Sequence, residues 1–233
     1  MKKEIKNIPK HIGIIMDGNR RWARERNLKT YDGHQKGFEL AKEMPKWFFE
    51  KGVEIISLYT FSTENWKRSR EEVNYLMKLL SSILKDNLKD LKDRGYRVLI
   101  SGRLEDLPGD LPDACLNAEA ETKDNNLGTL NICLNYGGRA EIVDAFKKML
   151  KKGIKIDQVH EGMIKKNLYH GDLSDPDLIV RTAGEKRLSG FLTWESIYSE
   201  LIFLEKYWPD FEKRDVDLII EEYSKRKRTF GKD

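Results

Sequence analysis

Six short apolar runs, separated by longer amphipathic segments, constrain the fold of this chain more than any other feature of its sequence. Runs of this kind are typical of parallel strands that are buried on both faces. Helical segments between such strands pack against the faces of the sheet. We therefore expect an α/β fold with a mostly parallel central sheet of about six strands flanked by helices. The expected strands are residues 12–16, 53–61, 96–101, 127–134, 178–180 and 201–204.

The apolar periodicity also predicts helices, and the longest spans residues 71–94, with its apolar side chains on one face. The other expected helices are 38–51, 112–125, 140–152 and 215–227. Because no composition shift, low-complexity stretch or internal repeat interrupts the chain, residues 1–233 are expected to form a single domain. In such folds ligands gather at the carboxyl ends of the strands, so functional residues are sought there.

Composition excludes several classes of protein. The net charge is +4, from 43 basic and 39 acidic residues, which does not indicate a nucleic-acid binder. Local lysine and arginine runs are interpreted as solvated faces. Cys115 and Cys133 offer no disulfide framework or metal spacing. The sequence lacks a signal-peptide segment and an apolar run of about 18 residues, so we expect a cytoplasmic protein.

Polar residues follow the first expected strand directly, in the order Asp17, Gly18, Asn19, Arg20 and Arg21. A helix that starts here directs free backbone N–H groups outward, and its arginines add positive charge, as a diphosphate site requires. Asp17 would repel the anion, so its expected use is through a hard cation such as Mg²⁺. The alternative is an ordinary capped helix with a solvated arginine face, and this segment alone leaves both interpretations open.

A second cationic group follows the fifth expected strand, where Arg181, Arg187 and Ser189 could converge on one anion. The alternative is a surface loop whose arginines pair with Glu185 or Glu195. Two anion sites at strand ends favour the functional interpretation, because one diphosphate at each site would make a two-substrate enzyme.

The second expected strand ends before Ser62, Asn65 and Arg68, which are placed to line the same crevice. A helix-capping turn is the alternative for this segment. His34 could polarise a diphosphate, although a lone histidine is more often structural. Dinucleotide-binding and Walker-type glycine motifs do not occur, which disfavours nucleotide-dependent functions.

Taken together, these motifs resemble the cis-prenyltransferase family, whose best-known members are the undecaprenyl diphosphate synthases. The resemblance runs from about residue 9 to the C-terminus, in the family's order and spacing. The matching stretches are residues 11–19, 21–23, 33–34, 58–66, 130–139, 181–182, 184–185, 187–189, 198–201 and 208–211.

The resemblance implies roles for individual residues. Asp17 corresponds to the Mg²⁺-binding aspartate, helped by Glu200. Gly18, Asn19, Arg20 and Arg21 correspond to the allylic diphosphate site. The isopentenyl diphosphate site is implied to consist of Arg181, Arg187 and Ser189. Residues that shape the site or assist transfer are implied to be Trp22, His34, Phe61, Ser62, Asn65, Trp66 and Arg68; of these we assign Ser62 and Asn65, with Asp17, to catalysis.

The implied function is the Mg²⁺-dependent condensation of isopentenyl diphosphate with an allylic prenyl diphosphate, which yields a Z (cis) polyprenyl diphosphate. The family also implies a homodimer and an apolar product tunnel, which helix 71–94 could line. A lipid product is compatible with peripheral membrane contact. The alternatives are a short-chain product, an unusual acceptor such as a prenylated lipid phosphate, and a non-catalytic subunit. Because such subunits typically lack the catalytic aspartate, the presence of Asp17 favours an enzyme.

Two departures from the family pattern concern diphosphate binding. Thr30 stands where an arginine is common, and Thr229 replaces the arginine of a C-terminal Arg-x-Gly pattern that ends here at Gly231. The resemblance therefore leaves open weaker binding, a different substrate, or compensation by Arg24, Lys29 or Arg228. Product length is not readable from the sequence, although Thr60 occupies a position where bulk matters in this family.

Overall fold

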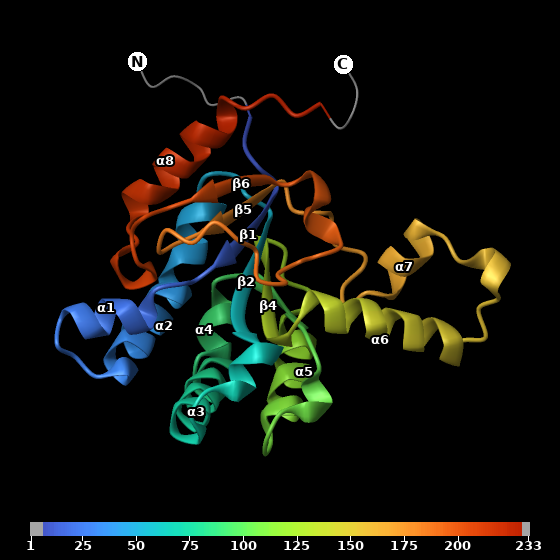
Figure 1. The fold of residues 1–233 in the computed structure, drawn as a ribbon, viewed down its shortest axis with the longest axis horizontal. Coiled ribbons are helices and arrows are strands. Elements are labelled where there is room, and N and C mark those ends of the chain that lie inside the picture. The colour runs from blue at the N-terminus through green and yellow to red at the C-terminus, as the bar shows by residue number, and fades with distance from the viewer. Residues whose placement is uncertain (1–6, 230–233) are drawn as a thin grey trace.

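A computed structural model describes residues 7–229 of the chain. Its centre is a six-stranded sheet in the order β3-β4-β2-β1-β5-β6, in which every strand pair is parallel (Figure 1). The expected α/β fold with a parallel sheet of six strands is therefore confirmed. The strands are β1 His11–Ile15, β2 Ile55–Ser62, β3 Tyr96–Ser101, β4 Gly128–Tyr136, β5 Leu178–Arg181 and β6 Glu200–Phe203.

Eight α-helices flank this sheet in the described residues. They are α1 Asn19–Glu25, α2 Thr30–Phe49, α3 Arg70–Asp86, α4 Leu88–Asp93, α5 Leu111–Thr122, α6 Gly138–Lys151, α7 Glu161–Asn167 and α8 Lys213–Ser224. In the part of the chain that the structure describes, none of them combines the length and the apolarity that crossing a bilayer would require.

Side-chain alternation along the strands gives the sheet two different faces. Ile12 and Ile14 of β1 point to the first face, which holds the larger hydrophobic core with Met44 and Phe48 of α2. Ile15 and its neighbours on the second face belong to a smaller cluster with Phe191 and Leu192. Because both faces are covered, the strands read as near-continuous apolar runs in the sequence.

A row of buried polar side chains crosses the second face from β1 to β3. His11 Nε2 lies 2.8 Å from Ser57 Oγ, Asn131 Nδ2 donates to Ser57 Oγ at 3.0 Å, and Ser101 Oγ donates to Asn131 Oδ1 at 2.8 Å. His11 Nδ1 lies 2.6 Å from the carbonyl oxygen of Ser174, which can only accept, so Nδ1 carries the proton and Nε2 accepts from Ser57. Each hydroxyl and amide in the row thus has a partner, and the row joins four strands.

Burial shifts the pKa values of titratable groups on this second face. Loss of hydration lowers the pKa of His11 to about 4. Burial, together with the charge of Glu195, raises the pKa of Glu141 to about 8. Cys133 is fully buried, which raises the pKa of its thiol well above the usual value, so Cys133 serves as a small core residue.

The helices differ from the sequence expectations at three places. The expected helix 71–94 is two helices, because Asn87 ends α3 and its side-chain amide donates to the Ser82 carbonyl at 3.0 Å. An asparagine that bonds a backbone carbonyl competes with the helical ladder. Helix α2 starts at Thr30 rather than at residue 38, since Gly33 and Gly37 obscure its apolar periodicity. Helix α7 was not expected, because its sequence is short and polar.

Candidate active site

A cavity of about 1530 Å³ opens at the carboxyl ends of the strands. Its wall includes Asp17 after β1, Ser62 at the end of β2, Gly137 after β4 and Arg181 at the end of β5. The topology of a parallel sheet brings these residues to one edge. The edge where the sequence analysis placed the functional residues is thus the edge that the cavity occupies.

Asp17 and Arg181 form an ion pair at the base of the cavity. Arg181 Nη2 donates to Asp17 Oδ2 at 2.8 Å, and Arg181 Nη1 donates to Ser189 Oγ at 2.9 Å. The Arg181 side chain is 6% exposed, whereas that of Asp17 is 29% exposed. The structure therefore brings together Asp17, Arg181 and Ser189, which lie far apart in the sequence.

Further ion pairs connect Asp17 to the loop that follows β5. Arg21 Nη2 is 3.4 Å from Asp17 Oδ2, and Arg21 Nη1 is 3.3 Å from Glu185 Oε1. Glu185 also pairs with Arg187, whose side chain is 60% exposed and does not line the cavity. The Arg187 guanidinium thus makes the pairing with Glu185 that the surface-loop interpretation expected. Its role at a diphosphate stays a prediction.

The α1–α2 wall of the cavity depends on close backbone approach. Gly18 precedes α1 with φ 108°, and a Cβ on Gly33 would lie 2.1 Å from the Asn19 carbonyl oxygen. A Cβ on Gly37 would lie 2.2 Å from Asn19 Oδ1. Only glycine permits this packing, which holds α1 beside the ends of the strands. Asn19 Oδ1 is buried there without a hydrogen-bond partner among residues 7–229.

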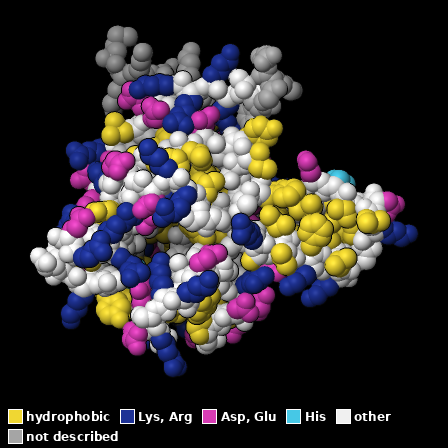
Figure 2. Space-filling model, viewed as in Figure 1, with side chains coloured by type: hydrophobic (Ala, Val, Ile, Leu, Met, Phe, Trp, Pro, Cys, Tyr) yellow, Lys and Arg dark blue, Asp and Glu magenta, His cyan; other side chains and the backbone are white. Residues whose placement is uncertain are grey.

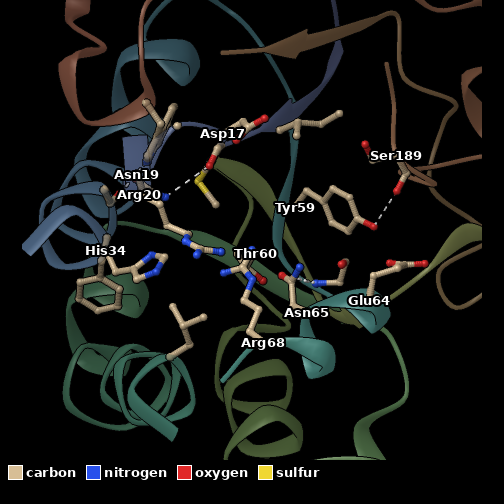
Figure 3. A pocket seen from close by; sticks show the side chains of 18 of the residues that line it. Asp17, Asn19, Arg20, His34, Tyr59, Thr60, Glu64, Asn65, Arg68 and Ser189 are labelled. Atoms are coloured by element: carbon tan, nitrogen blue, oxygen red, sulfur yellow. Dashed lines mark hydrogen bonds between the residues drawn. The ribbon is translucent and has the colours of Figure 1, made fainter. Parts of the chain in front are cut away.

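Three cationic or polar side chains lie close to one carboxylate oxygen of Glu72, a residue of α3. His34 Nε2 and Arg68 Nη1 each lie 3.1 Å from Glu72 Oε1, and Arg20 Nε lies 4.0 Å from it. Figure 3 shows Arg20, His34 and Arg68 pointing into the same space. Since a carboxylate only accepts hydrogen bonds, His34 donates from Nε2. Burial lowers the pKa of His34, so its imidazole is neutral at pH 7.

The residues that follow β2 form a turn and also face the cavity. The Ser62 backbone N–H donates to Asn65 Oδ1 at 3.2 Å, and the reciprocal contact closes a capping box. Ser62 and Asn65 both line the cavity, and Asn65 appears beside Arg68 in Figure 3. The capping turn and the crevice lining therefore coexist, and a catalytic role for either side chain stays a prediction.

Three aromatic residues that the family resemblance implicated lie away from the cavity lining. Phe61 is 1% exposed and packs edge-on against Trp66. Trp66 Nε1 donates to Asn135 Oδ1 at 2.7 Å, and Trp22 Nε1 donates to Asp210 Oδ1 at 2.6 Å. None of the three aromatic side chains lines the cavity in the described chain.

Glu200 lies at the other end of the sheet from Asp17. It is the first residue of β6 and pairs in register with Leu178, the first residue of β5, whereas Arg181 ends β5 beside Asp17. The Glu200 carboxylate accepts from Arg226 Nη1 at 2.8 Å. Within one chain the structure does not bring Glu200 to Asp17, and its metal role stays a prediction.

The cavity is apolar where α3 lines it. Leu76, Leu79 and Ile83 line it, while Val73 and Leu84, on the adjacent stripe of the same helix, are buried in the core. The apolar surface of α3 therefore divides between core packing and the cavity wall. Phe38 and Ala41 of α2 extend the apolar wall from the opposite side.

The donor set at the base suits Mg²⁺ held jointly with a substrate. No cluster of three or more His, Cys, Asp or Glu side chains that could hold a metal occurs within residues 7–229. Mg²⁺ is commonly bound by one or two carboxylates together with substrate phosphates. Asp17, as a part-exposed carboxylate on the wall of an arginine-rich cavity, fits that mode of binding.

Two features at the cavity were not assigned from the sequence, and the first is the buried carboxylate of Glu72 behind His34 and Arg68. Glu72 follows Ser69 in a Ser-x-x-Glu pattern, which reads as helix capping, and Ser69 Oγ does accept from the Glu72 N–H at 3.3 Å. Its carboxylate turns to His34 and Arg68 instead. Gly137, Gly138 and Arg139 line the cavity directly after β4. The rule that functional residues follow strand ends would have found them.

A family model described as "Putative undecaprenyl diphosphate synthase" matches residues 15–231. An isoprenyl transferase from Thermotoga maritima is 48% identical over 227 residues, which cover 96% of this chain and 97% of that protein. The tritrans,polycis-undecaprenyl-diphosphate synthase (geranylgeranyl-diphosphate specific) from Pyrococcus furiosus is 45% identical over 231 residues, covering 97% of this chain and 88% of that protein.

A solved structure shows the same likeness. The crystal structure of lavandulyl diphosphate synthase from Lavandula x intermedia in complex with dimethylallyl diphosphate matches with a TM-score of 0.92 and 31% identity. The match covers 99% of this chain and 100% of that chain. The parallel sheet, the cavity at its carboxyl edge and these matches over nearly the full length agree: the chain belongs to the undecaprenyl diphosphate synthase family of isoprenyl transferases.

Proposed function

We propose that the protein condenses isopentenyl diphosphate with an allylic prenyl diphosphate and forms a cis double bond in a polyprenyl diphosphate. The observation that carries this proposal is the form of the cavity, which is cationic at the strand ends and apolar between α2 and α3. A prenyl diphosphate has the same two parts, a dianionic to trianionic head and an apolar chain. The Pyrococcus furiosus relative, named for polycis products, supports the stereochemistry.

The two diphosphates have separate sets of cationic partners in this proposal. Arg20 and Arg21 on α1 would hold the allylic diphosphate, whose chain then runs toward Leu76 and Ile83. Arg181, with Ser189 at 2.9 Å, would hold the diphosphate of the isopentenyl substrate. Guanidinium groups suit this task, because they bind phosphate oxygens through paired hydrogen bonds.

The reaction follows from this placement. The allylic C–O bond breaks, and the electron pair leaves with the diphosphate, which the α1 arginines stabilise. The C4 end of the isopentenyl double bond then attacks the allylic carbon, and loss of a proton forms the new double bond. Mg²⁺ held at Asp17, when bound, would neutralise charge on the diphosphate that leaves. The apolar wall keeps water from the cationic carbon.

We propose that the apolar end of the cavity is the product tunnel. Leu76, Leu79 and Ile83 offer a hydrocarbon chain a surface that stabilises it by roughly 0.8 kcal/mol for each CH₂ group removed from water. Thr60 lines the cavity but donates to the Cys133 carbonyl at 2.7 Å, so its hydroxyl is held away from an apolar ligand.

We further propose a homodimer formed through α6 and α7. These helices extend from the sheet as an arm, and a yellow patch covers this arm in Figure 2. Leu150 is 73% exposed and Ile156 is 93% exposed, and Val143 and Phe146 lie on the same arm. Large contiguous apolar patches on a protein surface mark interaction sites. Sedimentation of a Phe146→Glu variant as a monomer, with the unchanged protein as a dimer, would support this interface.

A short-chain product is the second candidate function. The likeness to lavandulyl diphosphate synthase, with a TM-score of 0.92, favours it specifically. The two candidates share the cavity base and differ in how much chain the apolar end accepts.

Product sizing tests both candidates. The purified protein is incubated with Mg²⁺, labelled isopentenyl diphosphate and, separately, dimethylallyl, geranyl, farnesyl or geranylgeranyl diphosphate. We expect a ladder of long products from one of the longer primers. Carbon-13 NMR spectra of these products should show cis double bonds. A single-condensation product would establish the short-chain enzyme, and absence of any product would refute both.

A further inference from the structure

We propose that Arg24 is a binding residue for the allylic diphosphate, as a third side-chain cation beyond Arg20 and Arg21. The inference rests on the proposed function and assigns a residue to the same cavity. Arg24 lines the cavity wall together with Arg20, and the two lie four residues apart on α1. Side chains at this spacing share a helix face, so the cationic face of α1 continues for one more turn along the cavity.

The charges of the cavity wall distinguish Arg24 from its neighbours. Arg20 lies near Glu72, Arg21 pairs with Asp17 and Glu185, and Arg68 pairs with Glu72. Arg24 has no ion pair with any residue in the described range 7–229. Its positive charge is therefore available to a bound anion without the loss of an internal pair.

Arg139 shares this property but lies on the other side of the cavity. Arg139 follows Gly138, whose backbone N–H donates to the Gly190 carbonyl at 2.8 Å. Arg139 therefore lies near Ser189 rather than near α1. The allylic site on α1 accordingly has Arg24 as its unpaired cation.

The sequence of α1 is unfavourable for a helix that binds nothing. Its first turn holds no acidic residue, and Arg20 and Arg24 place like charges four residues apart. Such a pair destabilises a helix, and a bound anion between the two guanidinium groups would reverse the sign of that effect. Residues whose local preferences disfavour the secondary structure that they adopt are typical of functional sites.

The structure also separates the three residues that could compensate for Thr30. Thr30 lines the cavity, as does Arg24, whereas Lys29 does not. Arg228 pairs with Asp177, whose side chain accepts from the backbone of Lys10 before β1, so it lies at the amino edge of the sheet. Of these three cations, Arg24 is the one on the cavity wall.

Steady-state kinetics with farnesyl diphosphate and labelled isopentenyl diphosphate test the inference. We expect Arg24→Ala to raise KM for farnesyl diphosphate by roughly ten-fold or more, as for the loss of a charge-assisted hydrogen bond, and to leave KM for isopentenyl diphosphate within about two-fold. Lys29→Ala, which removes one exposed positive charge from the loop between α1 and α2, is the matched control and should show the same KM values as the unchanged protein. Arg24→Ala with Thr30→Arg should recover most of the loss.

The outcomes are distinct. Equal behaviour of Arg24→Ala and Lys29→Ala, or an equal rise of both KM values, would overturn the inference while the proposed function stands. If the unchanged protein makes no product, the proposed function fails, and calorimetric titration with farnesyl diphosphate replaces kinetics. The same ten-fold weakening in Arg24→Ala would then support the inference, and unchanged affinity would overturn it.

Discussion

Two groups of buried polar residues lie on this sheet, and they are built in opposite ways. The row from His11 to Ser101 on the second face is closed, because each side chain donates to the next and the last donor ends on a backbone carbonyl. The base of the cavity is open. There Arg181 Nε and Asn19 Oδ1 are buried without hydrogen-bond partners in the described chain.

The difference indicates what each group does. Buried polar atoms normally have hydrogen-bond partners, so burying a fully paired row costs little folding free energy, and the row fixes the pairing of the strands. An open group retains hydrogen-bonding capacity that a ligand can use. Substitutions in the cavity should therefore change turnover more than stability, and substitutions in the row should do the reverse.

The largest effect is expected for Asp17→Asn. Asparagine keeps an oxygen for Arg181 but removes the charge that would hold Mg²⁺, so turnover should fall by roughly 10² to 10³-fold. The free energy of unfolding should change by about 1 kcal/mol or less, since one hydrogen bond remains. Rates and urea denaturation on the same preparation measure both, and near-normal turnover would contradict the proposed role.

Acid should destabilise the row through His11. Its pKa is lowered to about 4 in the folded protein from 6.5, so the folded state favours the neutral ring. This stability is fully present above pH 6.5 and is lost as the pH falls toward 4, by at most about 3 kcal/mol. Urea denaturation between these pH values gives the slope. In His11→Gln that slope should flatten, and an unchanged slope would show that other groups cause it.

A smaller loss of stability is expected for Asn131→Ala. The substitution leaves Ser101 and Ser57 each without one partner, which should lower the free energy of unfolding by about 2 kcal/mol. Turnover per folded molecule should not change. Asn117→Ala on the exposed side of α5 is the control and should alter neither quantity. If Asn131→Ala lost much of its turnover under conditions where all of the protein is folded, the row would also serve catalysis, and the contrast with the cavity would be wrong.

The smallest effect concerns Glu72, a buried carboxylate that accepts hydrogen bonds from His34 and Arg68 of the cavity wall. Glu72→Gln removes the charge that orients Arg68 and His34, so kcat/KM should fall by roughly ten-fold. Glu71→Gln, one residue earlier and exposed, is the control. If both variants retain full activity, Glu72 serves packing alone.

Sequence patterns predicted the sheet well because strands such as β1 and β5 are buried on both faces. The expected strand 96–101 matches β3, and 178–180 differs from β5 by one residue. Helix ends were less predictable, since Asn87 acts through a side-chain bond to Ser82 that has no signature in apolar periodicity. Thr229 is the last described residue, and Phe230 and Gly231 of the C-terminal pattern lie outside the described range.

The candidate site was predictable in position but not in pairing. Residues after strand ends, such as Asp17 and Arg181, could be found because parallel topology fixes where they meet. Which charge pairs with which depends on side-chain direction, so the sequence alone did not indicate that Glu72 would serve Arg68 and His34. Nor did it indicate that Trp22 would donate to Asp210 instead of lining the cavity.

The ion pair between Asp17 and Arg181 has a thermodynamic consequence. Arg181 Nη2 donates to Asp17 Oδ2 at 2.8 Å, so each group partly neutralises the charge of the other. A cation that drew Asp17 away would release the guanidinium, which would then bind an anionic second substrate more tightly. By linkage, that substrate must strengthen cation binding by the same factor. One short contact would thus make metal and second substrate cooperative partners.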